Sequence, residues 1–272
     1  MSQALRNKII FFLSFGAMVA VLFSIAYMSF LRKIEVDVMD GMKLVYSGEN
    51  GSASVEADKS GNNINQREQA FLDTVEYQIE PSSGLKNGDI IHVKASYDHE
   101  IADQYNFDPV NTEMEVRVEG LVDKYNQLAD IDEKYLENIL KEADQYVDNR
   151  ETDIFRIEVE DKAKKPRLED NQTVYQAFLK AKDVGTDDRI LEIKRLMYKY
   201  KEKDYVLYFS VVVPQINQSN EVMDQDIYGE KANLTNEELE AQDYNGYVTR
   251  IYQNRFDIQP MITQQEETEN PE

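Results

Sequence analysis

Cysteine is absent from this 272-residue chain, which excludes disulfide bonds, thiolate catalysis and cysteine-based zinc sites. Histidine is nearly absent, since only His92 and His99 occur. His92 alternates with Lys94 and Ser96 on one face of an expected strand, and His99 falls in a polar turn, so neither is expected to be catalytic. Two histidines without a third ligand do not make a metal site. We therefore predict no metal and no cofactor.

Motifs of common catalytic chemistry are also missing. The chain has no Gly-x-Ser-x-Gly elbow and no glycine-rich phosphate loop. Acidic residues are so numerous, 52 in all, that some pair must lie close together, so closeness alone does not indicate glycoside hydrolysis. We predict no catalytic residues and a protein that is not an enzyme.

The longest hydrophobic run covers 9–31, 23 residues without a charge, and a bilayer core needs about 20. A buried core helix is rarely apolar all round over such a length. A cleaved signal peptide is the stronger rival, but its apolar part is normally shorter, and Ser24-Ile25-Ala26 is a poor cleavage site. The sequence favours one uncleaved transmembrane anchor. Its apolar positions include Ile9, Phe12, Phe15, Val19, Phe23 and Leu31.

The orientation of this anchor depends on its flanks. Arg6, Lys8 and the terminal amine precede it, and Arg32 and Lys33 follow it. The positive-inside comparison is nearly balanced, but a short basic head before a long apolar run is the usual signal-anchor layout. We therefore expect residues 1–8 in the cytoplasm and the bulk of the chain outside the cell membrane.

Three small residues recur at four-residue spacing within the anchor. They are Gly16, Ala20 and Ser24, and this spacing is typical of closely packed membrane helices. A homodimer through this face is one hypothesis, and an incidental stripe of small residues is the other.

Charge after the anchor is strongly acidic. Residues 1–33 contain four basic and no acidic residues, so 34–272 carry 26 basic and 52 acidic residues. Nucleic-acid binding needs clustered lysine and arginine, so we exclude it. The remaining interpretations are a solvated acidic surface or a surface for basic partners and cations.

The fold class expected is α+β. We predict a mainly antiparallel, sandwich-like β module over 34–125, because short alternating segments such as 71–80 and 90–97 are separated by glycine-rich turns. An amphipathic helix follows over 126–150, then a second α+β module over 151–260. The acidic residues 261–272 are expected to be a disordered tail.

Two helix starts carry capping signals. Asp130 with Glu133 predicts the start of the linking helix, and Thr235 with Glu238 predicts a short helix near the end of the chain. After the linking helix, 155–159 alternates apolar and polar residues and predicts a strand.

The segment 205–213 is a continuous apolar run that predicts a buried strand. The preceding 189–200 fits a helix or a strand, and a hairpin of the two is preferred. Their tyrosines either pack in the sheet or form an aromatic contact surface for a glycan or a protein. These candidate binding residues are Tyr198, Tyr200, Tyr205 and Tyr208.

An acidic loop begins at Asp224. Asp224, Asp226 and Gly229 fit positions 1, 3 and 6 of an EF-hand calcium loop. The bidentate glutamate at position 12 is missing, because Thr235 occupies it. An ordinary acidic loop is the preferred interpretation, and weak calcium binding is the alternative.

Three segments of the first module carry a resemblance to a known family. They are Leu44–Val55, Gly84–Asp98 and Val116–Leu121. Together they resemble the extracytoplasmic β-domain of Gram-positive membrane proteins called zinc-ribbon or TcaA-like. The resemblance implies an outward-facing domain and a role in cell-envelope homeostasis, and it supplies no catalytic residues. This chain departs from the family because its eight-residue head has no cysteine for a zinc ribbon.

The leading functional hypothesis is a membrane-anchored, extracytoplasmic binding or scaffold protein of a bacterial cell envelope. Its partner would be another envelope protein or a wall polymer. Two alternatives remain: a carboxylate-dependent enzyme acting on wall glycans, and a small membrane assembly subunit that acts through its transmembrane helix.

Overall fold

A computed structural model describes residues 3–28, 32–60, 66–159 and 165–261. The chain divides into two compact units. The first comprises Met1–Gly48 and Ala53–Gly120, and the second comprises Glu49–Ser52 and Leu121–Glu272. Of the tail predicted over 261–272, only Met261 is described, and its backbone N–H donates to the Gln176 carbonyl. The anchor position Leu31 also lies outside the described residues.

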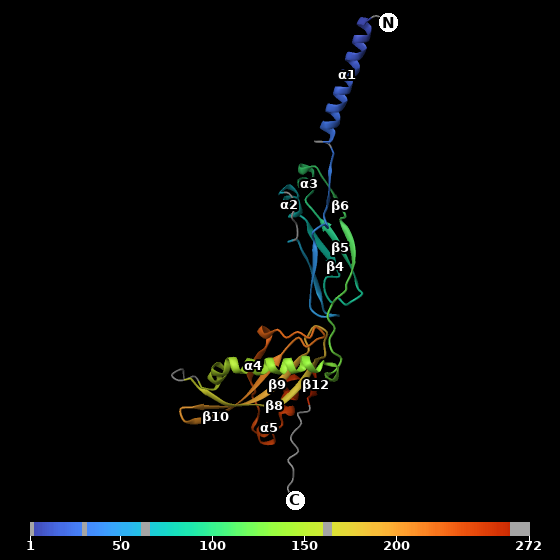
Figure 1. Cartoon of the computed structure of the whole chain (residues 1–272). Helices are drawn as coiled ribbons and strands as arrows, with labels where there is room; N and C mark the ends of the chain where they lie inside the picture. Colours follow the sequence, from blue (N-terminus) through green and yellow to red (C-terminus); the bar gives the residue numbers. More distant parts are fainter. Residues whose placement is uncertain (1–2, 29–31, 61–65, 160–164, 262–272) are drawn as a thin grey trace. The chain divides into compact units, whose positions relative to one another are not determined.

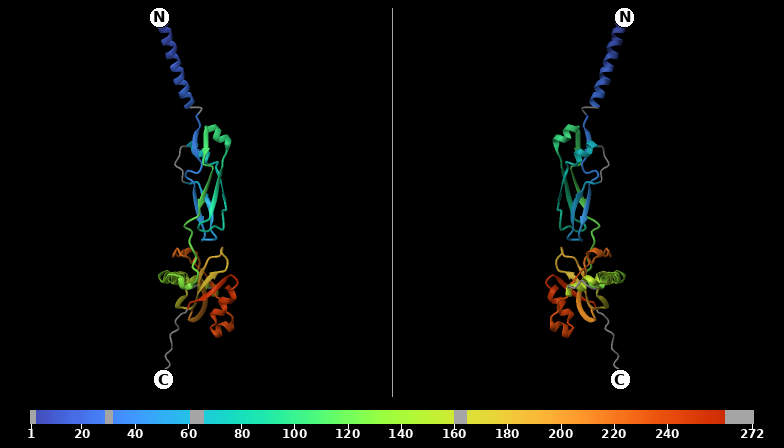
Figure 2. Two further views of the ribbon diagram at one scale, coloured as in Figure 1. Left: turned by 90° about the vertical axis from the view of Figure 1, so that its right-hand side faces the viewer. Right: turned by 90° about the vertical axis from the view of Figure 1, so that its left-hand side faces the viewer.

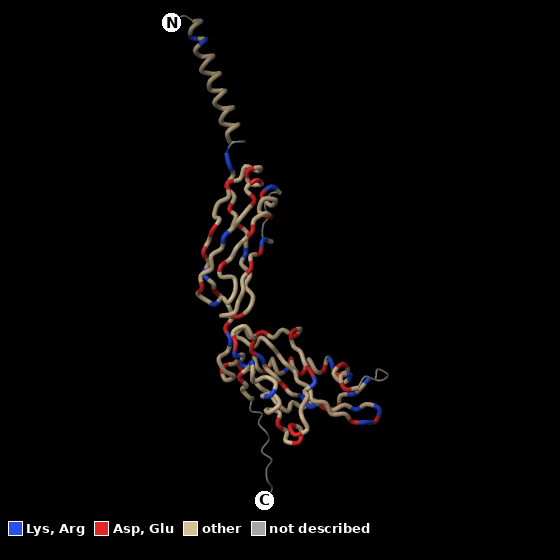
Figure 3. The backbone as a smooth tube through the Cα atoms, turned by 180° about the vertical axis from the view of Figure 1, so that it is seen from behind, with Lys and Arg blue, Asp and Glu red and all other residues tan. Residues whose placement is uncertain are grey.

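Helix α1 covers Gln3–Ala26 (Figure 1). Its apolar side chains are exposed around the helix, and no other part of the chain that the structure describes covers them. Charge is confined to its first turns, at Arg6 and Lys8 (Figure 3). One helical segment, Leu5–Ala26, is long and apolar enough to cross a membrane, as the sequence predicted for this part of the chain.

The rest of the first unit consists of short strands and two short helices. Strands β1 and β6 pair in parallel, β2 and β3 form an antiparallel hairpin, and β4, β5 and β7 form an antiparallel sheet in the order β4-β5-β7. Their bounds are β1 Ile34–Asp37, β2 Lys43–Ser47, β3 Ser54–Asp58, β4 Glu76–Glu80, β5 Ile90–Ser96, β6 Phe107–Val110 and β7 Glu113–Arg117. Helices α2 and α3 cover Gln66–Leu72 and His99–Tyr105.

The β4-β5-β7 sheet has one buried and one exposed face. On β5, Ile91, Val93 and Ala95 are buried, whereas the alternate residues are exposed. The period of two matches a strand with one face on a core. Phe71 of α2 lies in that core, with its ring 5.5 Å from the ring of Phe107.

The second unit is built on a five-stranded antiparallel sheet in the order β11-β10-β9-β8-β12. The long strands are β8 Arg167–Ala181, β9 Arg189–Tyr200 and β10 Lys203–Val213. The short edge strands are β11 Tyr228–Lys231 and β12 Phe256–Pro260. The preferred hairpin of β9 and β10 is confirmed, with Lys203 paired to Tyr200 across the turn.

Helices cover both faces of this sheet. Helix α4, Glu133–Glu158, lies along one face, and α5, Asn236–Ala241, with α6, Tyr244–Tyr252, lies on the other (Figures 1 and 2). Two hydrophobic cores result, one on each face. The α+β class is therefore confirmed, with the antiparallel sheet between helical layers.

Helix α4 differs from the prediction at both ends. Its N-cap is Asp132, whose side chain accepts a hydrogen bond from the Tyr135 backbone N–H, whereas Asp130 lies in the preceding 3-10 turn. The helix continues to Glu158, so the strand predicted over 155–159 was wrong. Phe155 is buried on the helix face that packs on the sheet, and packing of that face outweighs the local alternation.

The second predicted helix start is confirmed. Thr235 and Glu238 form the reciprocal capping box at the start of α5, with the Glu238 backbone N–H 3.1 Å from the Thr235 Oγ1. Both capping partners lie within four residues, so the signal is local and readable in the sequence.

Candidate functional site

The four candidate binding tyrosines lie on both faces of the sheet. Tyr198 and Tyr200 are buried under α4, and Tyr205 packs beside them. The Phe155 ring of α4 lies 5.1 to 5.4 Å from all three of their rings. The cluster therefore anchors α4 on the sheet, and Tyr198 and Tyr200 do not form an exposed contact surface.

Tyr208 is on the opposite face, where its ring lies 6.0 Å from that of Tyr244. It is partly buried. Burial raises the pKa of the Tyr198 hydroxyl above its ordinary value and that of Tyr244 to about 12. The raised pKa values fit hydroxyls kept neutral inside packed layers.

A buried ionic cluster occupies the sheet face beneath α4. Lys194 Nζ lies 2.6 Å from a carboxylate oxygen of its strand neighbour Glu192 and 2.6 Å from Asp144 on α4. It also donates to the Thr173 hydroxyl at 2.7 Å. Burial raises the pKa of the Glu192 carboxyl, and the nearby Lys194 charge opposes that rise. The cluster links α4, β8 and β9.

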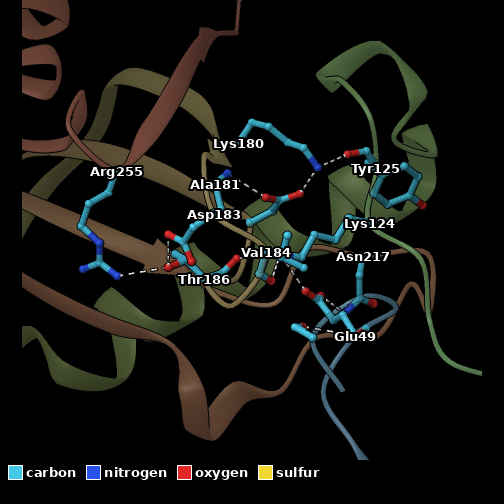
Figure 4. Close-up of polar contacts among 12 residues, drawn as sticks. Glu49, Lys124, Tyr125, Lys180, Ala181, Asp183, Val184, Thr186, Asn217 and Arg255 are labelled. Carbon is cyan, nitrogen blue, oxygen red and sulfur yellow. Dashed lines mark hydrogen bonds and ion pairs between the residues drawn. The ribbon is translucent and has the colours of Figure 1, made fainter. Parts of the chain in front are cut away.

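A second polar cluster gathers at the loops of the second unit (Figure 4). Lys124 Nζ donates to the backbone carbonyls of Val184 and Thr186 at 3.0 and 2.7 Å. It also lies 3.3 Å from Glu49, whose other carboxylate oxygen accepts from the Asn217 side-chain amide at 2.8 Å. The ammonium group joins its own segment to Glu49 and to the 184–186 turn, and Glu49 extends the cluster to Asn217.

Asp188 forms a further contact with Lys180 and Ala181, both of which are labelled in Figure 4. Its buried carboxylate lies 2.7 Å from Lys180 Nζ and accepts the Ala181 backbone N–H at 2.8 Å. Lys180 also donates to the Tyr125 carbonyl at 2.5 Å. Each buried charge here has a partner, as buried ions require. The cluster therefore fixes the β8–β9 turn and the 121–125 segment.

The histidines lie in the first unit and are polar surface groups. His92 forms an exposed contact with Glu115 at 3.3 Å across β5 and β7. His99 starts α3, and its ring lies 4.6 Å from that of Tyr97. Among the contacts of the described residues, neither histidine belongs to a catalytic arrangement of a serine, a histidine and a carboxylate.

The acidic segment at Asp224 does not have the EF-hand conformation. Asp224 and Asp226 lie in a 3-10 turn, and Gly229 lies in β11, paired with Val211 of β10. A Cβ added at Gly229 would lie 2.4 Å from the Phe209 ring and 2.8 Å from the Ser210 carbonyl oxygen. Close strand packing therefore accounts for this glycine. Within the described segments, no group of three or more His, Asp and Glu side chains could hold a metal ion.

A groove beside β10 is lined by Tyr208, one of the predicted binding tyrosines, together with residues that the sequence did not single out. It encloses about 450 Å³ and is lined by Glu158, Val206, Leu207, Tyr208, Lys231, Ala232, Asn233, Leu234 and Leu239. These residues come from α4, β10, β11, the loop after β11 and α5, so only the assembled sheet brings them together. The local signals were the apolar 205–213 run and its Tyr208.

The candidate dimer face and the anchor residues are on α1. Ile9, Phe12, Phe15, Val19 and Phe23 are exposed. Ser24 Oγ donates to the Ala20 carbonyl at 2.8 Å within the helix. A Cβ at Gly16 would have no neighbour within 4 Å. The helix-dimer hypothesis stays a prediction.

Comparison with known proteins gives no match to a family model, to a curated protein or to a solved structure. Function must therefore be argued from the chain itself.

Proposed function

We propose that this chain is a single-pass, membrane-anchored binding or scaffold protein of a bacterial cell envelope. Its α1 helix spans the cell membrane with the N-terminus in the cytoplasm. The two folded units face outward and recognise an envelope protein or a wall polymer without catalysing a reaction.

The observation that carries this proposal is the exposure of α1. From Ile9 to Ala26 the helix is apolar on every side, and no other described residues bury it. Burying one Leu, Ile or Phe side chain stabilises a protein by about 1.5–3 kcal/mol. The many exposed apolar side chains of α1 therefore need an apolar environment. A lipid bilayer supplies it over this length.

The outward orientation is supported by the basic residues Arg6 and Lys8 before the apolar run. The absence of cysteine and the resemblance of the first module to Gram-positive extracytoplasmic domains support an envelope location. Acidic and basic residues are interspersed along the backbone of both units (Figure 3), as expected of water-facing domains.

The non-catalytic role is supported by the environment of the buried charges. Lys194 and Asp188 each contact several groups that join helices, strands or turns. Their contacts stabilise the fold, and the described pockets do not expose either of them.

Orientation can be tested by cysteine labelling, because the natural chain has no cysteine. Asn7→Cys places a thiol before the apolar run, and Ser83→Cys places one in an exposed turn of the first unit. In intact cells, a membrane-impermeant maleimide should label Ser83→Cys and label Asn7→Cys only after lysis. The reverse pattern would overturn the proposed orientation.

Partner class can be tested with the full chain in detergent micelles. Saturable co-sedimentation with purified cell-wall sacculi would support a wall-polymer partner. Release of soluble wall fragments would contradict the non-catalytic role. Cross-linking from exposed positions of the outer units in intact cells tests for an envelope protein, and failure of both binding experiments would contradict the proposal.

A further inference from the structure

Strand β10 has an edge that its neighbour β11 covers only in part. Strand β11 pairs with β10 from Phe209 to Val212, whereas β9 pairs with β10 along its whole length. Among the described strands, none pairs with the β11 side of β10 between Lys203 and Leu207. We call this part of β10 the open edge.

The direction of the backbone groups at the open edge follows from one hydrogen bond. The Ala232 N–H donates to the Tyr208 carbonyl at 2.9 Å, so the backbone groups of Tyr208 point toward the β11 side. Because these groups alternate along a strand, those of Val206 and Asp204 point the same way. A further strand would find two sets of N–H and C=O groups ready for pairing.

The groove of about 450 Å³ lies where that further strand would run. The chain turns after β11, with the Leu234 N–H donating to the Ala232 carbonyl, and so does not continue along β10. Val206 and Leu239 line the groove and are 48% and 37% exposed. These apolar side chains can contact alternate residues of an added strand.

Charge around the groove selects the kind of strand. Asp204 lies on the same face of β10 as Val206, because side chains two apart share a face. Asp204, and Glu237 and Glu240 of α5, are exposed. The basic group in the groove, Lys231, contacts Glu158 of α4. Exposed Lys199 of β9 is the cross-strand partner of Asp204, so the rim has three carboxylates and one ammonium group. This acidic excess favours basic side chains near an apolar centre.

We propose that the open edge of β10 binds an extended segment of a partner protein by strand addition, with an apolar residue beside Val206 and a basic residue two positions away beside Asp204. This inference rests on the proposed binding role and assigns it a protein partner rather than a wall polymer. Backbone hydrogen bonds supply affinity, and the groove and its acidic rim supply specificity.

The test uses the full chain in detergent micelles and a short capped, fluorescent peptide. Valine and lysine alternate along one face of this peptide, and threonine fills the other face. Fluorescence anisotropy should show saturable binding, and replacing every lysine by glutamate should abolish it. Hydrogen exchange of the Val206 amide should slow when the peptide is bound. Absence of binding would overturn the inference.

Substitutions at the edge make the test specific. Val206→Pro removes only an N–H that points away from β9, and proline is tolerated on strand edges. It should weaken binding at least roughly tenfold, the equivalent of about 1.4 kcal/mol, whereas the matched Val206→Thr keeps the N–H and should weaken it less. Asp204→Lys, at an exposed position, should also weaken binding. This second variant tests the open edge without placing a proline in the strand.

Equal affinity for Val206→Pro, Asp204→Lys and the unchanged chain would overturn the inference. The proposed function would survive that result, because maleimide labelling at Ser83→Cys and cross-linking in cells test it independently. A cross-linker at Val206 that captures no protein, while other outer positions do, would likewise overturn only the assignment of the open edge.

Discussion

Lys194 and Glu192 form an ion pair of 2.6 Å in the middle of the five-stranded sheet, and both side chains are 1% exposed. They are two apart on β9 and so share the face beneath α4. Removing one partner of a buried pair leaves the other charge uncompensated, which is more costly than removing both.

Lys194→Met should therefore lower the free energy of unfolding by about 3–5 kcal/mol. The double variant Glu192→Gln with Lys194→Met should lose less than the sum of the single losses. Lys199→Met, at an exposed position on the same strand, is the control. It should change the free energy of unfolding by less than about 0.5 kcal/mol. Urea unfolding of the full chain in micelles, followed by tyrosine fluorescence, measures these three variants and the single Glu192→Gln; strictly additive losses would contradict the coupling.

The pH dependence of stability should carry a signature of Glu192. Burial raises its pKa in the folded chain above the ordinary 4.5, so the folded state favours the protonated form. The stabilisation is complete below about pH 4.5 and is lost as the pH rises through the folded-state pKa. The unfolding free energy of the unchanged chain minus that of Glu192→Gln should fall as pH increases. A difference that grows with pH would contradict this assignment.

Asp188 should be essential for the β8–β9 turn. Its buried carboxylate contacts Lys180 and the Ala181 N–H, and Asp188→Asn would leave Lys180 without its charge partner. We expect a loss of about 2–4 kcal/mol in unfolding free energy. Asp187 is the neighbouring residue and is half-buried. Asp187→Asn should lower the free energy of unfolding by much less. Equal effects of the two substitutions in urea unfolding would show that the ion pair contributes little.

Gly229 should be required for strand packing. In Gly229→Ala the new methyl group would meet the Ser210 carbonyl oxygen at 2.8 Å, so β11 must shift, at a cost of about 1–3 kcal/mol. Gly185→Ala is the matched control, because its nearest neighbour lies at 3.7 Å. Thermal unfolding by circular dichroism compares them. A Gly229→Ala melting temperature equal to that of the control would contradict the close approach.

The start of α4 can be assigned by a pair of aspartate substitutions. Asp132→Ala removes the acceptor of the Tyr135 N–H and should cost about 1 kcal/mol. Asp130→Ala removes an exposed contact with Gln127 and should cost less than about 0.5 kcal/mol. If Asp130→Ala were the more destabilising in urea unfolding, the helix would begin where the sequence alone suggested.

Several elements were predictable because their signals are local. A charge-free run fits the described α1 segment, the Thr235–Glu238 box starts α5, and the apolar run 205–213 lies in β10. The α+β class followed from the alternation of such segments. These features depend on neighbouring residues, whose chemistry is read directly from the chain.

Other features were decided by contacts between distant residues. Phe155 belongs to a helix because Tyr198, Tyr200 and Tyr205 surround its ring, and local alternation cannot express that packing. The spacing of Gly229 fits an EF-hand loop, which was the alternative to the preferred ordinary acidic loop, yet the close approach of Phe209 and Ser210 determines its role.

The sequence by itself determined the apolar helix, the acidic composition of the remainder and the main strands, since hydrophobic periodicity and capping act over a few residues. Only the tertiary structure decided that Tyr198 and Tyr200 are core residues, that Lys194 and Asp188 are buried and paired, and that β11 covers only part of the β10 edge. Strand order and the packing of α4 and α5 set those outcomes, because burial and pairing depend on which distant segments come together.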